Sequence, residues 1–411
     1  MSSLRLVGLL LLALSLPFAY IAIWRDVQFG YLSLPVVFFI FSLAQPWGKL
    51  PHYRFWRLFI VWLAVCTLVG FLLDQRFDFR QIKLLLALIL CTLLAEEMAQ
   101  FIRRSTVGIF IDAVIVAFTI NLIVTIIFGY EIRDEISRAS SFQSIGFSEY
   151  GLDEIGRQAS FNEFGAMSGF CALLAVTQFQ LHRNNSKRLL LYALLFCSSF
   201  YQVILTGSRS ATVATLVGFI LFCYLTRSIK LFVSVLFVIF GVFYFTDLGN
   251  NIINRFGNIF YDAYSSDAQS ALGRIDGILD GLDIFADNPV FGVGYGGYAF
   301  ASGSGFVTSE NYFVQLLAES GLVGLLLFLS FLYELDLVRR CALAHDQSPE
   351  QVILISGIAS GLAILVICNF SGTSLFDTTF MLCFVVFSMV MKSLAASKTD
   401  LHSARYATRS G

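Results

Sequence analysis

Arginine and carboxylate side chains at the edges of apolar segments are the residues of this sequence best suited to chemistry. Arg209 lies in LTGSRSATVA, between two apolar runs that leave no room for a domain. A charge so close to hydrocarbon is costly, which favours a functional role. Arg209 would clamp an anion, with Ser208 and the start of the following helix adding donors. The alternative is snorkelling to the interface or pairing with a loop carboxylate.

Two further arginines precede apolar or amphipathic segments. Arg274 lies in SALGRIDGILDG, and Arg157 lies in GRQASFNEFG. Taken singly, each is equally compatible with a solvated charge, which for Arg274 would be paired with a neighbouring aspartate. Three arginines at membrane entrances on one side suggest recognition of a phosphate group, because guanidinium binds phosphate oxygens in a bidentate manner.

The segment TSENYFVQLLAESG contains two glutamates where a long connection returns to an apolar run. Glu310 precedes Asn311 and Tyr312 at this boundary, where partial desolvation would let it act as a general base. The alternative is an acid that interacts favourably with the dipole of the following helix. Glu319 would lie about 13 Å deeper along a helix, and we expect it to pair within the bundle.

Membrane helices must position these residues. Hydrophobic residues make up 57% of the 411-residue chain and charged residues 13%, whereas a soluble domain carries about a quarter charged residues. Apolar runs of about 20 residues recur throughout, and each could cross a bilayer as a helix. We predict an all-α polytopic integral membrane protein, a single membrane domain over 1–411, with about 12 spans at 4–23, 31–45, 57–73, 83–97, 106–129, 161–181, 189–206, 210–226, 229–246, 311–333, 352–369 and 376–392.

Lys and Arg alternate between the connections in a way that orients these spans. Most of them fall at the two termini and in every second connection, so both termini and the tail 393–411 are predicted to be cytoplasmic. The two longest connections, 130–160 and 247–310, are then extracytoplasmic. Within 247–310, apolar residues recur at helical spacing, which predicts an amphipathic helix; they are Ile275, Ile278, Leu279, Leu282 and Phe285. This helix would lie on the membrane or cap the bundle, and Pro289 would end it. The glycine-rich FGVGYGGYAF then turns the chain back toward the bilayer.

Several classes of function are disfavoured. A net charge of −1 gives no reason to expect a nucleic-acid partner. Four aspartates of the amphipathic helix could hold a cation, but their spacing is also that of a solvated helix face. All four histidines, His52, His182, His345 and His402, fall on the predicted cytoplasmic side, and no C-x-x-C pair occurs. Histidine chemistry and zinc binding are therefore not expected on the extracytoplasmic side, and we predict neither a metal nor a cofactor.

Four segments together resemble the superfamily of O-antigen ligases and Wzy-type polymerases, which act in bacterial surface polysaccharide synthesis. They are GRQASFNEFGAMSGF, LTGSRSA, SALGRIDGILDGLDIFADNPVFGVGYGGY and ENYFVQLLAESGLVGLLLF. The resemblance covers roughly residues 155–335. Its most specific part is N-P-x-F-G-x-G, from Asn288 to Gly294.

The resemblance implies a GT-C-like glycosyltransferase of the bacterial inner membrane. It would act without a metal on undecaprenyl-diphosphate-linked glycans at the periplasmic face. Arg209 and Arg274 match family positions that engage the lipid diphosphate, and Arg157 is a further candidate. Ligases of the family carry a histidine before the asparagine of the final motif, whereas this chain has Glu310 before Asn311. That difference favours a polymerase.

The hypothesis is therefore polymerisation of lipid-linked repeat units of O-antigen, capsule or exopolysaccharide, with the carrier-linked glycan as both donor and acceptor. Glu310, Arg209 and Arg274 are the predicted catalytic residues, and the predicted substrate-binding residues are Arg157, Ser208, Asn311 and Tyr312. Surrounding membrane lipid and a chain-length regulator are the other implied partners. A ligase that transfers glycan to lipid A-core stays open, as does a flippase or other transporter, although no duplicated halves are evident.

Overall fold

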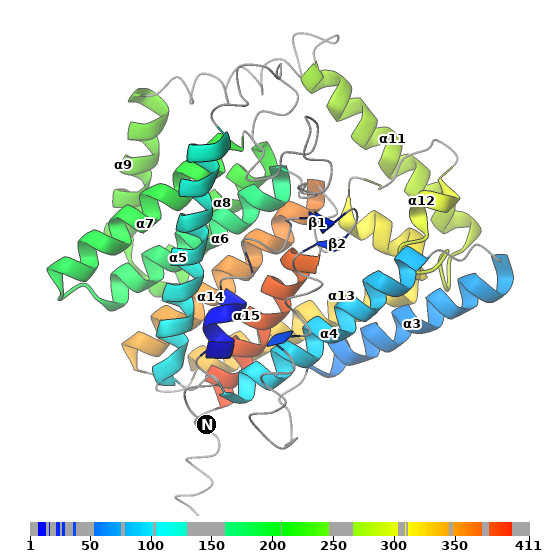
Figure 1. The fold of residues 1–411 in the computed structure, drawn as a ribbon, viewed down its shortest axis with the longest axis horizontal. Helices are drawn as coiled ribbons and strands as arrows, with labels where there is room; N and C mark the ends of the chain where they lie inside the picture. The colour runs from blue at the N-terminus through cyan, green and yellow to red at the C-terminus, as the bar shows by residue number, and fades with distance from the viewer. Residues whose placement is uncertain are drawn as a thin grey trace, which may run out of the picture.

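The structure of the protein is a computed structural model, and it describes residues 7–13, 16, 22–24, 27–28, 36–37, 53–74, 79–101, 104–129, 161–206, 208–245, 266–302, 309, 311–344, 348–371 and 378–396. These residues form a bundle that is almost entirely helical (Figure 1). The helices are α3 (Arg54–Asp74), α4 (Phe79–Phe101), α5 (Arg104–Gly129), α6 (Phe161–Leu181), α7 (Ser186–Leu205), α8 (Arg209–Thr226), α9 (Ile229–Phe245), α11 (Ser266–Asp287), α12 (Tyr298–Ala301), α13 (Tyr312–Ala344), α14 (Pro349–Cys368) and α15 (Thr378–Ala396). A 3-10 turn, η1 (Asn369–Ser371), and a short antiparallel pair, β1 (Ala22–Trp24) and β2 (Val27–Gln28), complete the described elements.

From residue 53 onward, every predicted span coincides with a helix, and most ends agree to within a few residues. α13 is the exception, because it continues to Ala344 instead of ending near 333. The spans predicted at 4–23 and 31–45 are described only in part. Residues 7–13 are helical, but Ala22–Trp24 form a strand, so the first predicted helix does not extend to residue 23. The connection 130–160 lies outside the described residues.

Several of these helices have the length and apolar composition of membrane spans. Among the described residues, four segments are long and apolar enough to cross a bilayer: Arg54–Leu72, Arg209–Thr226, Tyr312–Leu343 and Pro349–Cys368. Shorter apolar helices cover Thr106–Asn121, Gly165–Leu181 and Phe380–Ala395. Large apolar side chains also cover outward faces, as at Leu72, Leu194 and Phe237. These are the features of a polytopic membrane protein.

α6 lies at the centre of the part of the bundle that positions the candidate site. It packs against α7, α8 and α14, and its residues 165–178 are buried. A Cβ atom on Gly165 would come within 2.7 Å of the Cβ atom of Ala211, so only glycine lets α6 and α8 approach this closely. Gly169 and Gly361 make similarly close contacts with Thr215 and with Phe170. Lipid tails are as apolar as the surfaces of membrane helices, so the hydrophobic effect does not drive these helices together. Small residues let them approach closely and associate through van der Waals packing.

Ion pairs, one of them with a buried glutamate, tie the helices together at the end of the bundle that carries most of the basic residues. Arg57 of α3 binds Glu96 of α4 through two hydrogen bonds of 2.9 and 2.6 Å, and the glutamate side chain is 1% exposed. Glu334 of α13 accepts from the backbone N–H of Arg54 at 3.3 Å and lies 3.4 Å from the ammonium group of Lys392. These pairs join α3, α4, α13 and α15 at one level.

Candidate functional site

Arg209 is the first residue of α8, directly after the tight α7–α8 turn. Ser208 is the N-cap of this helix, and its Oγ accepts a hydrogen bond from the N–H of Ala211 at 3.2 Å. Only 6% of Ser208 is exposed, whereas Arg209 is partly exposed. The helix start therefore presents a guanidinium group beside backbone donors, which favours a bound anion. Ser208 fixes that geometry through its cap.

Asn311 occupies the matching position at the start of α13. Its Oδ1 accepts from the N–H groups of Phe313 and Val314 at 3.0 and 3.1 Å, which is N-cap geometry. Its Nδ2 donates to the carbonyl oxygen of Phe370 at 2.9 Å. Ser309 adds a hydrogen bond from its Oγ to the carbonyl oxygen of Asn311 at 2.6 Å. Asn311 is thus held between α13 and η1.

The end of α14 links the two helix starts, which are far apart in the sequence. Cys368, its last residue, has its Sγ 3.9 Å from the Oγ of Ser210, next to Arg209. Phe370 of η1 lies against Phe313, with 4.6 Å between the ring centroids. The Arg209 turn and Asn311 therefore lie on two sides of the same helix end.

α11 carries Arg274 to the same region. This helix was predicted from its amphipathic pattern, and it ends at Asp287, before Pro289. Its face toward the bundle is formed by glycines, since a Cβ atom on Gly277 would lie 3.2 Å from the carbonyl oxygen of Ser309. Arg274 is three residues before Gly277, and hence on the same face of the helix about one turn away. The Arg274 face of α11 is therefore directed to the start of α13.

The other faces of α11 stay open. Ile275 and Leu279 are 53% and 54% exposed. Of the four aspartates, Asp280 accepts a hydrogen bond from the hydroxyl of Tyr298 at 3.1 Å. Figure 1 shows α11 along the edge of the bundle beside α12 and α13. α11 thus packs its glycines against the start of α13 and leaves Ile275 and Leu279 exposed, and its contact with a membrane surface stays a prediction.

The glycine-rich run after α11 has a function that the sequence analysis missed. α13 is interrupted at Gly321, whose φ of 66° and ψ of −173° are not helical. The loop 289–297 docks on this break: the N–H of Val293 donates to the carbonyl oxygen of Ala318 at 2.9 Å, and that of Leu322 donates to Pro289 at 2.9 Å. Freed backbone groups inside a membrane protein need such partners. The glycines of N-P-x-F-G-x-G and of AESG were the available signal.

Glu319 binds the same loop, which confirms the expectation that it pairs within the bundle. It is fully buried and accepts from the N–H groups of Gly296 at 2.8 Å and Tyr298 at 3.3 Å. Gln315 donates to the same carboxylate at 3.0 Å. Because the hydroxyl of Tyr298 donates to the carbonyl oxygen of Gly277 at 2.9 Å, Glu319 also holds α11 in place.

The remaining predicted site residues have different outcomes. Tyr312 is 2% exposed, and its ring packs 5.2 Å from that of Phe328, so it belongs to the core. Its predicted contact with substrate stays a prediction. Glu310 and Arg157 lie outside the described residues.

A family model matches part of the chain. No curated protein sequence matches the chain. Residues 192–329 match a family model described as O-antigen ligase, and the matched stretch contains Arg209, Arg274, Asn311 and Glu319. The match does not separate polymerases from ligases. The predicted resemblance is thus confirmed over residues 192–329, which are similar to the O-antigen ligase family.

Proposed function

We propose that the protein polymerises undecaprenyl-diphosphate-linked oligosaccharide repeat units of a bacterial surface polysaccharide. One observation supports the proposal: the Arg209 turn and Asn311 lie on two sides of the end of α14, and α11, which carries Arg274, packs against α13. The family domain supports transfer of glycans from lipid-linked substrates in a membrane. Two arginines at one end of a helix bundle suit the diphosphate of such a donor.

The chemistry follows from the charges. The acceptor hydroxyl of a second lipid-linked unit attacks the anomeric carbon of the donor, and the bond from that carbon to the diphosphate oxygen breaks. Arg209 and Arg274 stabilise the negative charge of the departing diphosphate, so positive charge is available without a metal. Glu310 is the proposed base that takes the hydroxyl proton. A single displacement of this kind inverts the anomeric centre.

The other site residues would bind or position substrate. Asn311 holds the start of α13 and the end of α14 together, next to the proposed base, while Ser208 fixes the start of α8 beside Arg209. Arg157 precedes α6, whose Gly165 packs against the Arg209 turn. Arg157 is therefore proposed as a third contact of the diphosphate.

The distribution of charge supports an extracytoplasmic site. α8 runs from Arg209 at the candidate site to Thr226, and Arg227 follows at the opposite end. Arg183, Arg188 and Arg339 are at that same opposite end by the direction of their helices. By the positive-inside rule this end is cytoplasmic, which gives an inner-membrane enzyme with a GT-C-like arrangement, cytoplasmic termini and a periplasmic active site.

Deletion of the gene in its native host, with complementation, tests the proposal. Surface glycan would be separated on a gel after complementation with wild type, Arg209→Ala, Arg274→Ala or Glu310→Gln, at matched protein levels in the membrane. Arg183→Ala is the control, because Arg183 is an exposed arginine at the other end of the bundle. We expect a ladder with wild type and the control, and a single repeat unit with the three site variants.

The second candidate is an O-antigen ligase, favoured by the description of the matching family. A ligase would lose all surface glycan on deletion, and carrier-linked polymer would accumulate. An unchanged ladder in a host with no second polymerase gene would refute the polymerase. Accumulation of carrier-linked single units inside the cell would instead indicate a flippase.

A further inference from the structure

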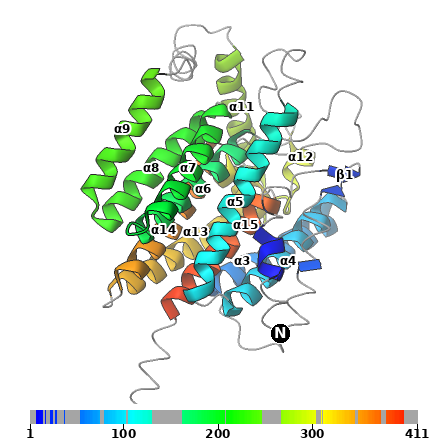
Figure 2. The same ribbon diagram turned by 60° about the vertical axis from the view of Figure 1, so that its left-hand side comes forward.

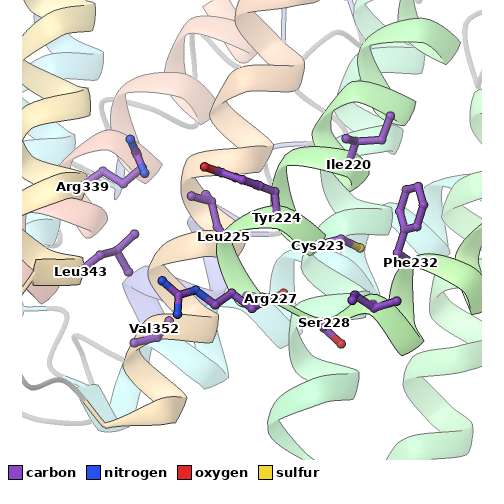
Figure 3. A pocket seen from close by; sticks show the side chains of 12 residues that line it. Ile220, Cys223, Tyr224, Leu225, Arg227, Ser228, Phe232, Arg339, Leu343 and Val352 are labelled. Atoms are coloured by element: carbon purple, nitrogen blue, oxygen red, sulfur yellow. The ribbon is translucent and has the colours of Figure 1, made fainter.

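A cavity of about 980 Å³ opens at the end of the bundle opposite to the candidate active site (Figure 3). α8, α9, α13 and α14 form its walls. Much of its lining is apolar, including Ile220, Leu225, Phe232, Leu343 and Val352, and two arginines, Arg227 and Arg339, enter it from different walls. The volume is that of a pocket for a molecule the size of a ligand or a lipid headgroup with the first part of its chains.

The backbone holds Arg227 in an uncommon conformation that directs its side chain across the cavity. Its φ of 52° and ψ of 35° are left-handed, and its N–H donates to the carbonyl oxygens of Cys223 and Tyr224. A residue other than glycine pays about 1 kcal/mol for this conformation. Figure 3 shows the guanidinium directed toward Leu343 and Val352. Within the described part of the chain, the Arg227 side chain has no hydrogen-bond or ion-pair partner.

The charges around the cavity leave an excess of positive charge. On α13, Arg339 and Arg340 share one partner, Asp336, at 2.9 and 2.6 Å. Among the described residues that line the cavity, the charged ones are Arg227 and Arg339, and Asp336 is the acid bound to Arg339 and Arg340. A phosphate between Arg227 and Arg339 would reduce this excess.

We propose that this cavity binds an anionic phospholipid, with its phosphate between Arg227 and Arg339 and its acyl chains along the apolar lining. The neighbouring surface supports a lipid over a soluble anion, because Ile229 and Phe237 of α9 are 78% and 77% exposed, as lipid-facing residues would be. Arginines at the ends of spans lie at the depth of the headgroups, and basic pockets between helices on the cytoplasmic side suit anionic lipids. The two views show α9 at the outer edge of the bundle, next to α8 (Figure 2).

A bound lipid would connect the α8–α9 hairpin to α13 and α14. α8 has Arg209 at its other end, so the lipid would also steady the helix that carries a proposed catalytic residue. The binding site itself does not depend on the proposed function, because no residue of the cavity belongs to the candidate active site.

Native mass spectrometry of the purified full-length protein tests the proposal. The protein in detergent is incubated with phosphatidylglycerol or with phosphatidylcholine of the same chain length, and retained lipid is counted. We expect wild type to retain phosphatidylglycerol about tenfold more strongly, which is about 1.4 kcal/mol. Arg227→Gln/Arg339→Gln should lower phosphatidylglycerol retention to the level of phosphatidylcholine. Arg183→Gln removes an exposed arginine outside the cavity and should behave as wild type.

Replacement of Arg339 also removes its ion pair with Asp336 and could therefore disturb the fold. The single variant Arg227→Gln, which leaves that pair intact, controls for this effect. This single variant should keep the melting temperature of wild type and lose several-fold in phosphatidylglycerol retention. Retention unchanged in both variants overturns the site. Equal retention of the two phospholipids by wild type would contradict a preference for anionic lipid and show that the cavity binds acyl chains only. Displacement of phosphatidylglycerol by inorganic phosphate or by undecaprenyl phosphate at equal concentration would show that the ligand is a different one.

Discussion

Replacement of Gly321 by alanine tests whether the break in α13 is built around the loop 289–297. The φ and ψ of Gly321 fall in a region that is essentially restricted to glycine, and a strained residue there costs about 1–3 kcal/mol. The new Cβ atom would overlap the carbonyl group of Val290 and lie 2.8 Å from the carbonyl oxygen of Pro289. Both are backbone atoms that cannot rotate away, so overpacking adds about 1–3 kcal/mol.

Gly321→Ala should therefore lower the free energy of unfolding by about 2–6 kcal/mol. At an unfolding entropy of about 2.1 cal/mol/K per residue, each kcal/mol lowers the melting temperature of a 411-residue chain by about 1 °C, so we expect a fall of about 2–7 °C. The assay is thermal unfolding of the purified protein in one detergent at one scan rate, since irreversible unfolding makes the midpoint depend on rate.

Gly273→Ala is the matched control on α11. Nothing lies within 4 Å of a Cβ atom at Gly273, and the residue is helical, so alanine should leave the melting temperature unchanged or raise it slightly. A melting temperature of Gly321→Ala equal to that of wild type would refute the docking of the loop on the break. A loss of glycan polymerisation in Gly321→Ala, with Gly273→Ala active, would further show that the loop positions α11.

Three more substitutions probe single contacts by the same thermal assay. Glu319→Gln weakens the hydrogen bonds to the loop and should lower the free energy of unfolding by about 2 kcal/mol, and Glu319→Ala should lower it further. Melting temperatures equal to that of wild type would contradict the role of Glu319 in holding Tyr298. Arg57→Gln leaves buried Glu96 without its partner and should lower the free energy of unfolding by about 3 kcal/mol. The double variant Arg57→Gln/Glu96→Gln should restore most of this loss. A double variant no more stable than the single one would argue against the ion pair. Asn311→Ala removes the cap of α13 and should cost about 1 kcal/mol, whereas Asn311→Ser should lose less than half of that, and the reverse order would exclude capping.

The break in α13 also bears on the transporter hypothesis. Interrupted membrane helices often surround the substrate site of a transporter. Here the backbone around Gly321 binds protein groups, since the N–H of Gly294 donates to the carbonyl oxygen of Glu319 at 3.0 Å and the indole of Trp62 donates to that of Ser320 at 2.9 Å. The interruption therefore holds the loop and, through Tyr298, α11. That arrangement suits a structural role of the interruption more than a transport pathway.

The positions of the helices from α3 onward could be predicted from the sequence because apolar length is a local property. A run of about 20 apolar residues has no stable alternative to a helix in a bilayer. α11 was equally accessible, because its apolar repeat and Pro289 lie within one segment. Arg209 and Arg274 stood out for the same reason, since a charge near an apolar run is visible without knowledge of its neighbours.

Only the tertiary structure decided what these elements do together. Asn311 is a cap that also binds Phe370, Tyr312 belongs to the core, and Gly321 opens α13 to a loop from another part of the chain. Each of these facts depends on which distant segments pack against one another, and long-range packing leaves no periodic mark in the sequence. The composition and local pattern of the chain determined a membrane bundle with arginines beside its apolar segments. The packing of α14 against α8 and of α11 against α13 determined which of those segments lie next to one another.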